Sequence, residues 1–313
     1  MNAAQREIDL ARRWLEAASA GDFTSAWAAS DTLRHQGIDY SSRERWCRPL
    51  WNGSPIDGCD VLIRCWRGLG DAIHFIRYAP LVRSRACSLT VEAPATLVPL
   101  FRTVPGIDRL IQLDRADLKV DGGVEIESTE LPYVFRTTLD TIPCTTPYLD
   151  VPGHPVKTGK QQLNVGLCWC GGSYDLRRSM RLSDLEPLSA LKEANFFQLQ
   201  RGAALRETVG ASMTFRNPAD CSMDLCRTAS LIKSLDLIVS VDTMVAHLAG
   251  ALGKKVYVLL HADADWRWLK ERNDSPWYPT MKLLRQSHAG DWEPVVNGLV
   301  GNLARDCRDL AGN

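Results

Sequence analysis

A single carboxylate, Asp71, stands where a glycine-containing loop runs into a predicted helix. The stretch reads RGLGDAIHFIRYAP and follows an apolar run at residues 61–65 that predicts a buried strand. Gly68 and Gly70 leave open space beside the carboxylate, and the positive end of a helix favours its ionised form. An ionised carboxylate can accept a proton from an attacking hydroxyl group, whereas the alternative role is only to stabilise the helix start.

A second pattern, LDLIVSVDTMVAHLAGALGKKVYVLL, reads as strand, turn, helix and strand with few residues between them. Asp242 or Thr243 would cap the helix, and the N–H groups at a helix start can bind phosphate. The alternative is a capped helix in an ordinary α/β sheet. Because Asp242 would repel an anion, we assign it to the turn or to a ribose hydroxyl.

Three arginines follow a third strand in the stretch GLCWCGGSYDLRRSMRL. Arg177, Arg178 and Arg181 come after the pair Gly171 and Gly172. Guanidinium groups offer charged, fork-shaped donors for phosphate oxygens, and small residues let a ligand approach the backbone. A solvated surface loop is the alternative interpretation.

Three further candidates are Gln200, Arg201 and Gly202, which come where the strand of FFQLQRG ends. The carboxyl ends of parallel strands face a ligand crevice in such sheets, so these residues would lie beside it. Alone they are weak evidence.

The overall composition excludes several classes of protein. The chain has 313 residues, 45% hydrophobic and 24% charged, with 37 basic and 37 acidic side chains. This zero formal charge gives no basic field for nucleic acid. The ten cysteines are scattered, without paired Cys-x2-Cys spacing, so we expect reduced thiols and no metal. A charged N-terminus and the absence of a membrane-length apolar run predict a cytoplasmic protein.

The first 45 residues predict a helical hairpin. Apolar residues recur at three- and four-residue spacing and the pattern breaks at Gly21 and Asp22. The hairpin resembles one tetratricopeptide unit. Because one unit cannot bury its apolar face alone, it must pack on the following domain, on a lost array or on another protein.

Two α/β halves follow, which predicts parallel sheets with right-handed crossovers. We place the first at residues 46–155, a Pro- and Gly-rich linker at 151–162, the second half at 163–290 and a closing helix in 291–313. The expected strands are 61–65, 88–92, 109–113, 163–168, 196–200, 237–241 and 255–260. The expected helices are 71–85, 95–103, 182–194, 225–234, 243–252 and 292–310. Two such halves predict a ligand cleft between them.

Several of these motifs occur together in a known family. GLGDAIHFIRYAP and SVDTMVAHLAGALGKKVYVLL, supported by VGLCWCGG, RRSMRLSDLEPL, FQLQRG and DWRWLKERNDSPWYP, resemble the heptosyltransferase-like glycosyltransferases of family 9. The closest resemblance is to a bacterial branch that often carries tetratricopeptide units before the transferase. The resemblance covers about residues 46–305. It implies a GT-B fold, in which two Rossmann-like domains face each other and the last helix returns to the first domain.

The resemblance also implies roles for particular residues. It makes Asp71 the base, with Gly68 and Gly70 on the acceptor side, and it implies a metal-free mechanism. Met244 departs from the pattern, because classical heptosyltransferases have a glycine there. The donor-binding residues that it implies are Arg178, Gln200, Arg201, Gly202, Asp242, Thr243, Met244 and His247.

The resulting hypothesis is an inverting glycosyltransferase that uses a nucleotide-diphosphate sugar such as ADP-heptose. Its acceptor would be a glycan, a lipid-linked core or a protein, with a further protein partner bound through the hairpin. The alternative, motivated by Met244 and the lone hairpin, is an inactive GT-B adaptor or nucleotide-sugar-binding module. A dehydrogenase is disfavoured because no G-x-G-x-x-G follows a strand.

Overall fold

The computed structural model describes residues 3–35, 50–113, 123–153, 162–216 and 224–312, and these form two compact units. The first unit comprises residues 1–144 together with 265–272. The second comprises residues 145–264 and 273–313. Most of the predicted linker, residues 154–161, and the end of the predicted hairpin region, residues 36–45, lie outside the described residues.

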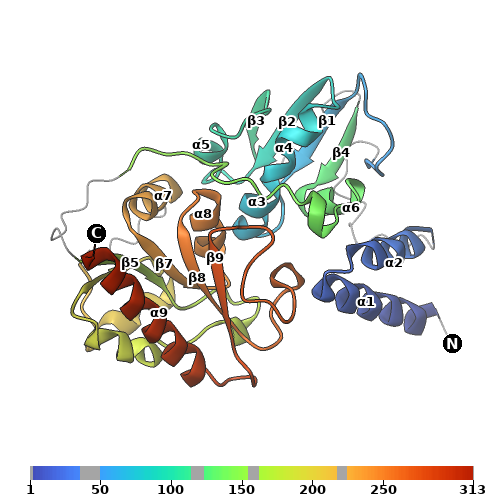
Figure 1. The fold of residues 1–313 in the computed structure, drawn as a ribbon. Coiled ribbons are helices and arrows are strands. Elements are labelled where there is room, and N and C mark those ends of the chain that lie inside the picture. Colours follow the sequence, from blue (N-terminus) through green and yellow to red (C-terminus); the bar gives the residue numbers. More distant parts are fainter. Residues whose placement is uncertain (1–2, 36–49, 114–122, 154–161, 217–223, 313) are drawn as a thin grey trace. The chain divides into compact units, whose positions relative to one another are not determined.

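The first unit contains a four-stranded, fully parallel sheet in the order β3-β2-β1-β4 (Figure 1). Its strands are β1 (Asp60–Arg64), β2 (Ser88–Ala93), β3 (Arg109–Gln112) and β4 (Val124–Glu127). Its short α-helices are α3 (Leu69–Phe75), α4 (Ala79–Arg83), α5 (Val98–Phe101) and α6 (Leu131–Val134). Val61, Leu62 and Ile63 of β1 are buried, as the apolar run at residues 61–65 predicts.

The segment 71–85, predicted as one continuous helix, is divided in the structure. The structure has α3, a 3₁₀ turn at Ile76–Tyr78 and then α4. Pro80 lies at the start of α4, where it lacks an N–H group and its ring clashes with a preceding helical turn. The proline therefore splits the segment, and α3 begins two residues earlier than predicted.

The N-terminal hairpin consists of α1 (Ala3–Ala20) and α2 (Phe23–His35), which lie side by side (Figure 1). Gly21 has a φ of 83°, a conformation that glycine adopts without a steric penalty, and it closes the turn. Trp27 donates through Nε1 to the Thr137 carbonyl oxygen at 2.7 Å, and Asp31 pairs with Arg136 at 2.7 Å. The hairpin therefore packs on the domain that follows it in the sequence, which is one of the three possibilities that the sequence left open.

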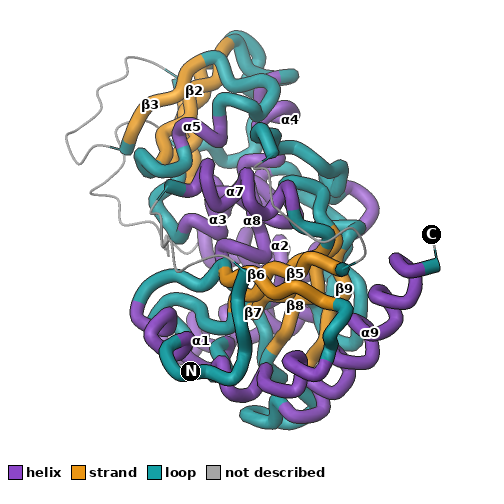
Figure 2. Tube along the Cα trace, turned by 90° about the vertical axis from the view of Figure 1, so that its left-hand side faces the viewer, coloured by secondary structure: helices purple, strands orange, loops and turns teal. Residues whose placement is uncertain are grey.

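The second unit contains a five-stranded parallel sheet in the order β6-β5-β7-β8-β9 (Figures 1 and 2). Its strands are β5 (Leu163–Cys168), β6 (Ala194–Gln198), β7 (Leu237–Val241), β8 (Lys255–Leu260) and β9 (Met281–Arg285). Its α-helices are α7 (Leu225–Ser234), α8 (Met244–Ala251) and α9 (Glu293–Ala311). With the first sheet and the hairpin, this confirms the predicted α/β class with two Rossmann-like units.

Further differences from the predicted elements concern the helix at 182–194, the start of β6 and two strands that were not predicted. The predicted helix at 182–194 is a 3₁₀ segment, Leu182–Ala190, because Pro187 inside it prevents the α-helical hydrogen bonding. Strand β6 accordingly begins at Ala194. The prediction also omits β4 and β9, which pair in parallel with β1 and β8 at the ends of the two sheets.

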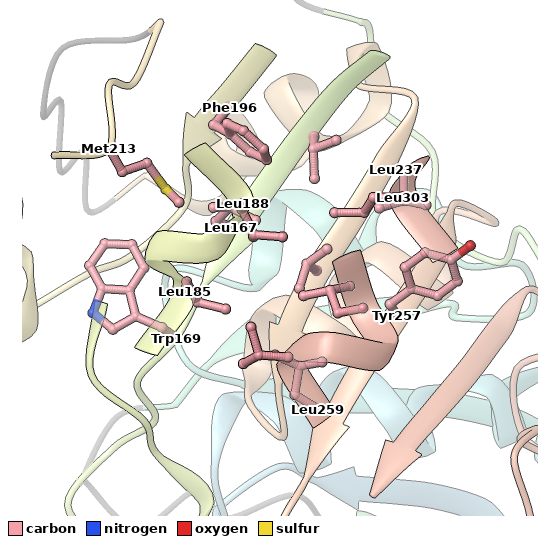
Figure 3. Packing of buried hydrophobic residues seen from close by; sticks show 14 of the residues in the cluster. Leu167, Trp169, Leu185, Leu188, Phe196, Met213, Leu237, Tyr257, Leu259 and Leu303 are labelled. Atoms are coloured by element: carbon pink, nitrogen blue, oxygen red, sulfur yellow. The ribbon is translucent and has the colours of Figure 1, made fainter. Parts of the chain in front are cut away.

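The core of the second unit lies between its sheet, the 3₁₀ segment Leu182–Ala190 and α9 (Figure 3). Figure 3 shows Trp169, Leu185 and Met213 in the same apolar cluster as Leu259 and Leu303. Helix α9 belongs to this unit and runs along its sheet in both views (Figures 1 and 2). Its predicted return to the first domain stays a prediction.

Candidate functional site

Asp71 lies in the first turn of α3, beyond the carboxyl end of β1. Its Oδ2 accepts a hydrogen bond from the Gly68 N–H at 3.2 Å, which is the helix-stabilising contact of the simpler hypothesis. Its Oδ1 forms an ion pair with Nη2 of Arg267 at 2.7 Å. The side chain remains 31% exposed. Asp71 is therefore fixed by two contacts and still reaches solvent.

Gly68 lies close to the Asp71 carboxylate. A Cβ atom added there would lie 3.3 Å from Oδ2 of Asp71, which is tighter than ordinary van der Waals contact. A larger residue at this position would crowd the carboxylate, and the acceptor-side role of Gly68 stays a prediction.

Arg267 comes from the 3₁₀ turn Trp266–Trp268, in the chain segment between β8 and β9. Besides Asp71, it pairs through Nη1 with Asp265 at 2.7 Å, and its guanidinium lies 4.9 Å from the centre of the Phe75 ring. Only 13% of its side chain is exposed. Its partners on three sides hold the guanidinium in one place.

Buried charges fix the loop that leads to Asp71. Arg64, the last residue of β1, pairs with Glu125 at 2.8 Å and with Glu92 at 3.0 Å, and all three side chains are buried. Trp66 donates from Nε1 to the same Glu92 carboxylate at 2.9 Å. Breaking one partner of a buried ion pair costs ~3–5 kcal/mol, so these contacts anchor the loop firmly.

In the second unit, Thr243 caps α8 at the carboxyl end of β7. Its Oγ1 accepts from the Val245 N–H at 3.2 Å and lies 3.1 Å from Oγ of Ser240. This confirms Thr243 as the N-cap residue among the two candidates. The N–H groups and positive dipole of the helix start are therefore oriented by a buried hydroxyl.

Arg178, in the loop after β5, lies near the start of α8. A Cβ atom added at Gly171 would lie 2.8 Å from Nε of Arg178 and 3.4 Å from Cγ2 of Thr243. Nε of Arg178 is buried and has no hydrogen-bond partner within the part of the chain that the structure describes. The structure thus brings Arg178, Gly171 and Thr243 together, with an unsatisfied cationic donor among them.

The other two arginines of this loop have different surroundings. Arg177 is 67% exposed and forms a two-pronged contact with Asp175 at 2.8 and 2.9 Å. Arg181 is exposed and lines a separate hollow with Glu186 and Glu207. Geometry therefore favours Arg178 over its two neighbours as an anion ligand.

Gln200 braces the loop that contains Gly171. Its Oε1 accepts from the Trp169 and Cys170 N–H groups at 3.1 and 2.9 Å. Its Nε2 donates to the carbonyl oxygens of Cys170 and Arg201 at 3.1 and 2.9 Å. The amide thus forms these four hydrogen bonds with backbone groups, and Oε1 also accepts from Sγ of Cys168 at 3.6 Å. Direct contact of Gln200 with a donor stays a prediction.

Arg201 and Gly202 follow directly. Gly202 has a φ of 74°, and a Cβ atom added there would meet open space, so the turn needs glycine for its backbone conformation rather than to avoid crowding. The half-buried Arg201 side chain lies beyond the end of β6. Donor contacts of both residues stay predictions.

His247 and Asp242 are buried neighbours around the start of α8. Nδ1 of His247 lies 3.1 Å from Oη of Tyr278, and its Nε2 lies 3.8 Å from Oδ1 of Asp242. Both ring nitrogens of His247 thus lie near polar side chains of the same unit. Met244 opens α8 and is half-buried. The donor contacts of these three residues are likewise still predictions.

Some charged residues near these positions were missed by the sequence analysis. Hydrogen bonds from Arg177 lower the pKa of the Asp175 carboxyl to about 2. Burial lowers the pKa of His261, whose Nε2 lies 4.0 Å from Asp175 at the end of β8. Arg267 lies within the motif DWRWLKERNDSPWYP, and no local pattern reveals its pairing with Asp71, 196 residues away.

Two further kinds of chemistry concern metal ligands and the Cys168 thiol. No group of three or more His, Cys, Asp or Glu side chains is arranged to hold a metal ion within the described ranges. Burial raises the pKa of the Cys168 thiol, which is close to Thr243, to about 11. This thiol stays protonated at neutral pH and is a poor nucleophile.

The helices do not include a membrane-spanning segment among the described residues. None of them combines the length and apolar character needed to cross a bilayer.

Solved structures define the class of fold. The chain is similar to the glycosyl transferase family 9 structure from Veillonella parvula DSM 2008, with a TM-score of 0.55 and 13% identity over 82% of this chain and 99% of that one. The E. coli heptosyltransferase WaaC with ADP gives a TM-score of 0.51 and 10% identity, over 79% of this chain and 99% of that one. The chain therefore has the GT-B fold of these glycosyltransferases.

Two further similar proteins are the heptosyltransferase TibC and protein FlbA. The dodecameric iron-containing heptosyltransferase TibC, from enterotoxigenic E. coli H10407, was solved with ADP-D-beta-D-heptose; its TM-score is 0.52 and its identity 14%, over 80% of this chain and 78% of that one. Protein FlbA of Caulobacter vibrioides is 26% identical over 329 residues, which cover 94% of this chain and 54% of that protein. The chain thus spans about half the length of the curated relative it matches. No protein-family model matches it.

Proposed function

We propose that the protein is an inverting glycosyltransferase of the family 9 type, which uses a nucleotide-diphosphate sugar as donor. The observation that carries the proposal is the buried Nε of Arg178, which lacks a hydrogen-bond partner among the described residues and lies beside Gly171 and the N-terminus of α8. A buried donor without a partner is costly, and an anion would satisfy it. WaaC and TibC, which share the fold, were solved with ADP and ADP-D-beta-D-heptose.

The second unit supplies the donor-binding groups in this proposal. The diphosphate accepts hydrogen bonds from Arg178 and from the N–H groups at the start of α8, which Thr243 orients. When the bond from the anomeric carbon to the diphosphate breaks, the electron pair leaves with the diphosphate. The same cationic and dipolar groups stabilise that growing negative charge, so the step requires no metal ion.

The first unit supplies the base. Asp71 takes the proton of the acceptor hydroxyl as its oxygen bonds to the anomeric carbon, and the sugar configuration inverts. An ionised carboxylate has about four lone-pair sites, and Gly68 and Arg267 each use one. Asp71 therefore keeps acceptor capacity for a hydroxyl group.

The acceptor in this proposal is a hydroxyl of a glycan, a lipid-linked core or a protein.

The eight cysteines within the described residues are free thiols, which supports a reducing, cytoplasmic location.

A second function is favoured by one observation. The ion pair between Arg267 and Asp71 occupies the carboxylate, as expected if the acid has only a structural role. In that case the protein is an inactive adaptor that binds a nucleotide sugar.

A panel of nucleotide sugars separates the two functions. We expect ADP and ADP-D-beta-D-heptose to raise the melting temperature, and ADP release from the sugar nucleotide to be catalysed. Stabilisation without ADP release, with water and with a panel of hydroxyl acceptors, would support the adaptor. If no nucleotide diphosphate stabilises the protein, the proposed donor site is wrong.

A further inference from the structure

The segment 265–272 belongs to the first unit and links the N-terminal hairpin to Asp71. Two successive side chains in it have different partners. Arg267 pairs with Asp71 at 2.7 Å. Trp266 packs edge-on against Trp14 at 5.6 Å and against Phe23 at 5.7 Å between ring centres. One short turn therefore contacts the hairpin through one residue and the acid through the next.

The hairpin holds this segment at a second point. The Lys270 N–H donates to the Ser19 carbonyl oxygen at the end of α1, at 2.7 Å. The residues on either side of Lys270, Leu269 and Glu271, have φ angles of 50° and 60°. Side chains rarely adopt this conformation, and it persists where surrounding contacts impose it. The backbone bond to Ser19 lies between the two strained positions, so the hairpin contributes to holding this shape.

The hairpin itself is firmly placed on the first unit. Its Trp27 ring lies 6.1 Å from the Tyr133 ring, and Oη of Tyr133 donates to Asp31 of α2 at 2.6 Å. Trp14 and Phe23, which contact Trp266, both pack against Trp27, at 6.3 and 5.9 Å. The aromatic cluster thus continues from the body of the unit, through the hairpin, to Trp266.

We propose that the N-terminal hairpin is a positioning element for Asp71, and that it acts by clamping Trp266 so that Arg267 stays on the carboxylate. The inference rests on the proposed function, because it assigns Asp71 the catalytic task. Arg267 and Trp266 are positioning residues in this account. A displacement of about 1 Å at a reacting group can cost about 100-fold in rate, which makes such a brace consequential.

The test compares Trp14→Ala with Leu15→Ala, a neighbour on α1 whose side chain is 52% exposed. Hydrogen–deuterium exchange is measured on the full chain, over residues 265–272 and over the first turn of α3. We expect Trp14→Ala to speed exchange in both segments by about tenfold, because local opening becomes easier when packing contacts are lost. Leu15→Ala should leave both segments unchanged. Trp266→Leu, which removes the contact from the other side, replaces Trp14→Ala if that variant fails to fold.

Arg267→Met tests whether the effect passes through the proposed contact. We expect it to speed exchange in the first turn of α3, and we expect the double variant Trp14→Ala/Arg267→Met to add nothing there. Additive effects at α3, or no effect of the hairpin variant on residues 265–272, would overturn the inference.

Turnover distinguishes a positioning role from simple stabilisation. With ADP-D-beta-D-heptose as the probe, Trp14→Ala should lower kcat about tenfold or more and leave the donor KM within about twofold. Unchanged kcat in a variant whose exchange has increased would overturn the positioning role. If the wild-type protein does not release ADP at all, the proposed function fails, and the exchange results alone still decide whether the hairpin holds Arg267 on Asp71.

Discussion

Asp71 in the first unit and Arg178 in the second differ in the partners that their charged groups have. The carboxylate of Asp71 already has a cationic partner, Arg267, and a backbone donor, Gly68. Arg178 has a buried Nε without a hydrogen-bond partner among the described residues, although it stands at a helix start that favours anions. A compensated charge is held in position without a ligand, whereas an uncompensated one gains free energy when a ligand arrives. In the proposed function, this difference corresponds to a base that is held in position and to a buried donor, Nε of Arg178, that an anion would satisfy.

The largest expected effect is that of Asp71→Asn. Because an amide cannot take the proton, kcat for sugar transfer should fall by about 10²- to 10⁴-fold. The affinity for ADP should stay within about twofold, since the proposed donor contacts lie in the other unit. Steady-state kinetics and calorimetry check both values.

Asp140→Asn is the control for this variant, because Asp140 is an exposed carboxylate of the same unit. Turnover by Asp71→Asn at the wild-type rate would show that this acid is not the base.

The second effect concerns Arg178→Gln. Loss of a charge-assisted hydrogen bond, worth about 1.5–3 kcal/mol, should weaken ADP binding about 10- to 100-fold. Arg181→Gln changes a neighbour that faces the hollow with Glu186, so it should leave ADP affinity nearly unchanged. Equal losses in the two variants would mean that only the general charge of the loop matters.

A smaller effect is expected from Gly171→Ala. The new methyl group would lie 2.8 Å from Nε of Arg178 and must displace that side chain. Gly172→Ala is the matched control, because its methyl group would lie 3.8 Å from Nη2 of the same arginine, at ordinary contact distance. ADP titration should show a several-fold loss for the first variant alone, and the comparison fails if both lose affinity equally.

The smallest effect concerns stability. Arg177 lowers the pKa of Asp175 from 3.8 to about 2, so the pair stabilises the folded protein above about pH 4 and this contribution disappears as the pH falls toward 2. Arg177→Gln should lower the free energy of unfolding by under about 1 kcal/mol at neutral pH, since the Arg177 side chain is 67% exposed and solvent screens the pair. Urea denaturation at pH 7 and pH 3 should give a smaller difference at the lower pH.

Arg177→Gln should leave the affinity for ADP nearly unchanged, unlike Arg178→Gln, because the charge of Arg177 is already paired with Asp175. A difference in unfolding free energy that grows toward low pH would contradict the assigned pairing.

Local patterns predicted those parts of the fold that depend on short stretches of sequence. The strands β1, β5, β7 and β8 are rich in apolar residues and mostly buried, and the cap of α8 is a local contact of Thr243. Strand β4 was missed because two of its four residues are glutamates, and burial of Glu125 depends on Arg64, 61 residues earlier. Such pairing arises only when the chain has folded.

The candidate site shows the same limit. Asp71 could be selected from its loop and helix start, and Arg178 from the glycines before it. The choice of Arg178 over Arg177 and Arg181 needed their surroundings: Arg177 pairs with Asp175, and Arg181 lines a hollow with Glu186 and Glu207. The part played by Arg267 depends on a segment that follows β8 in the sequence but belongs to the first unit.

Arg178 and the N-terminus of α8 are the proposed binding groups for a nucleotide diphosphate. A crystal structure of the protein with ADP would locate the diphosphate relative to them. We expect diphosphate oxygens within hydrogen-bonding distance of Nε or Nη2 of Arg178 and of the first N–H groups of α8. A diphosphate bound elsewhere, with Arg178 still without an anionic partner, would contradict the account.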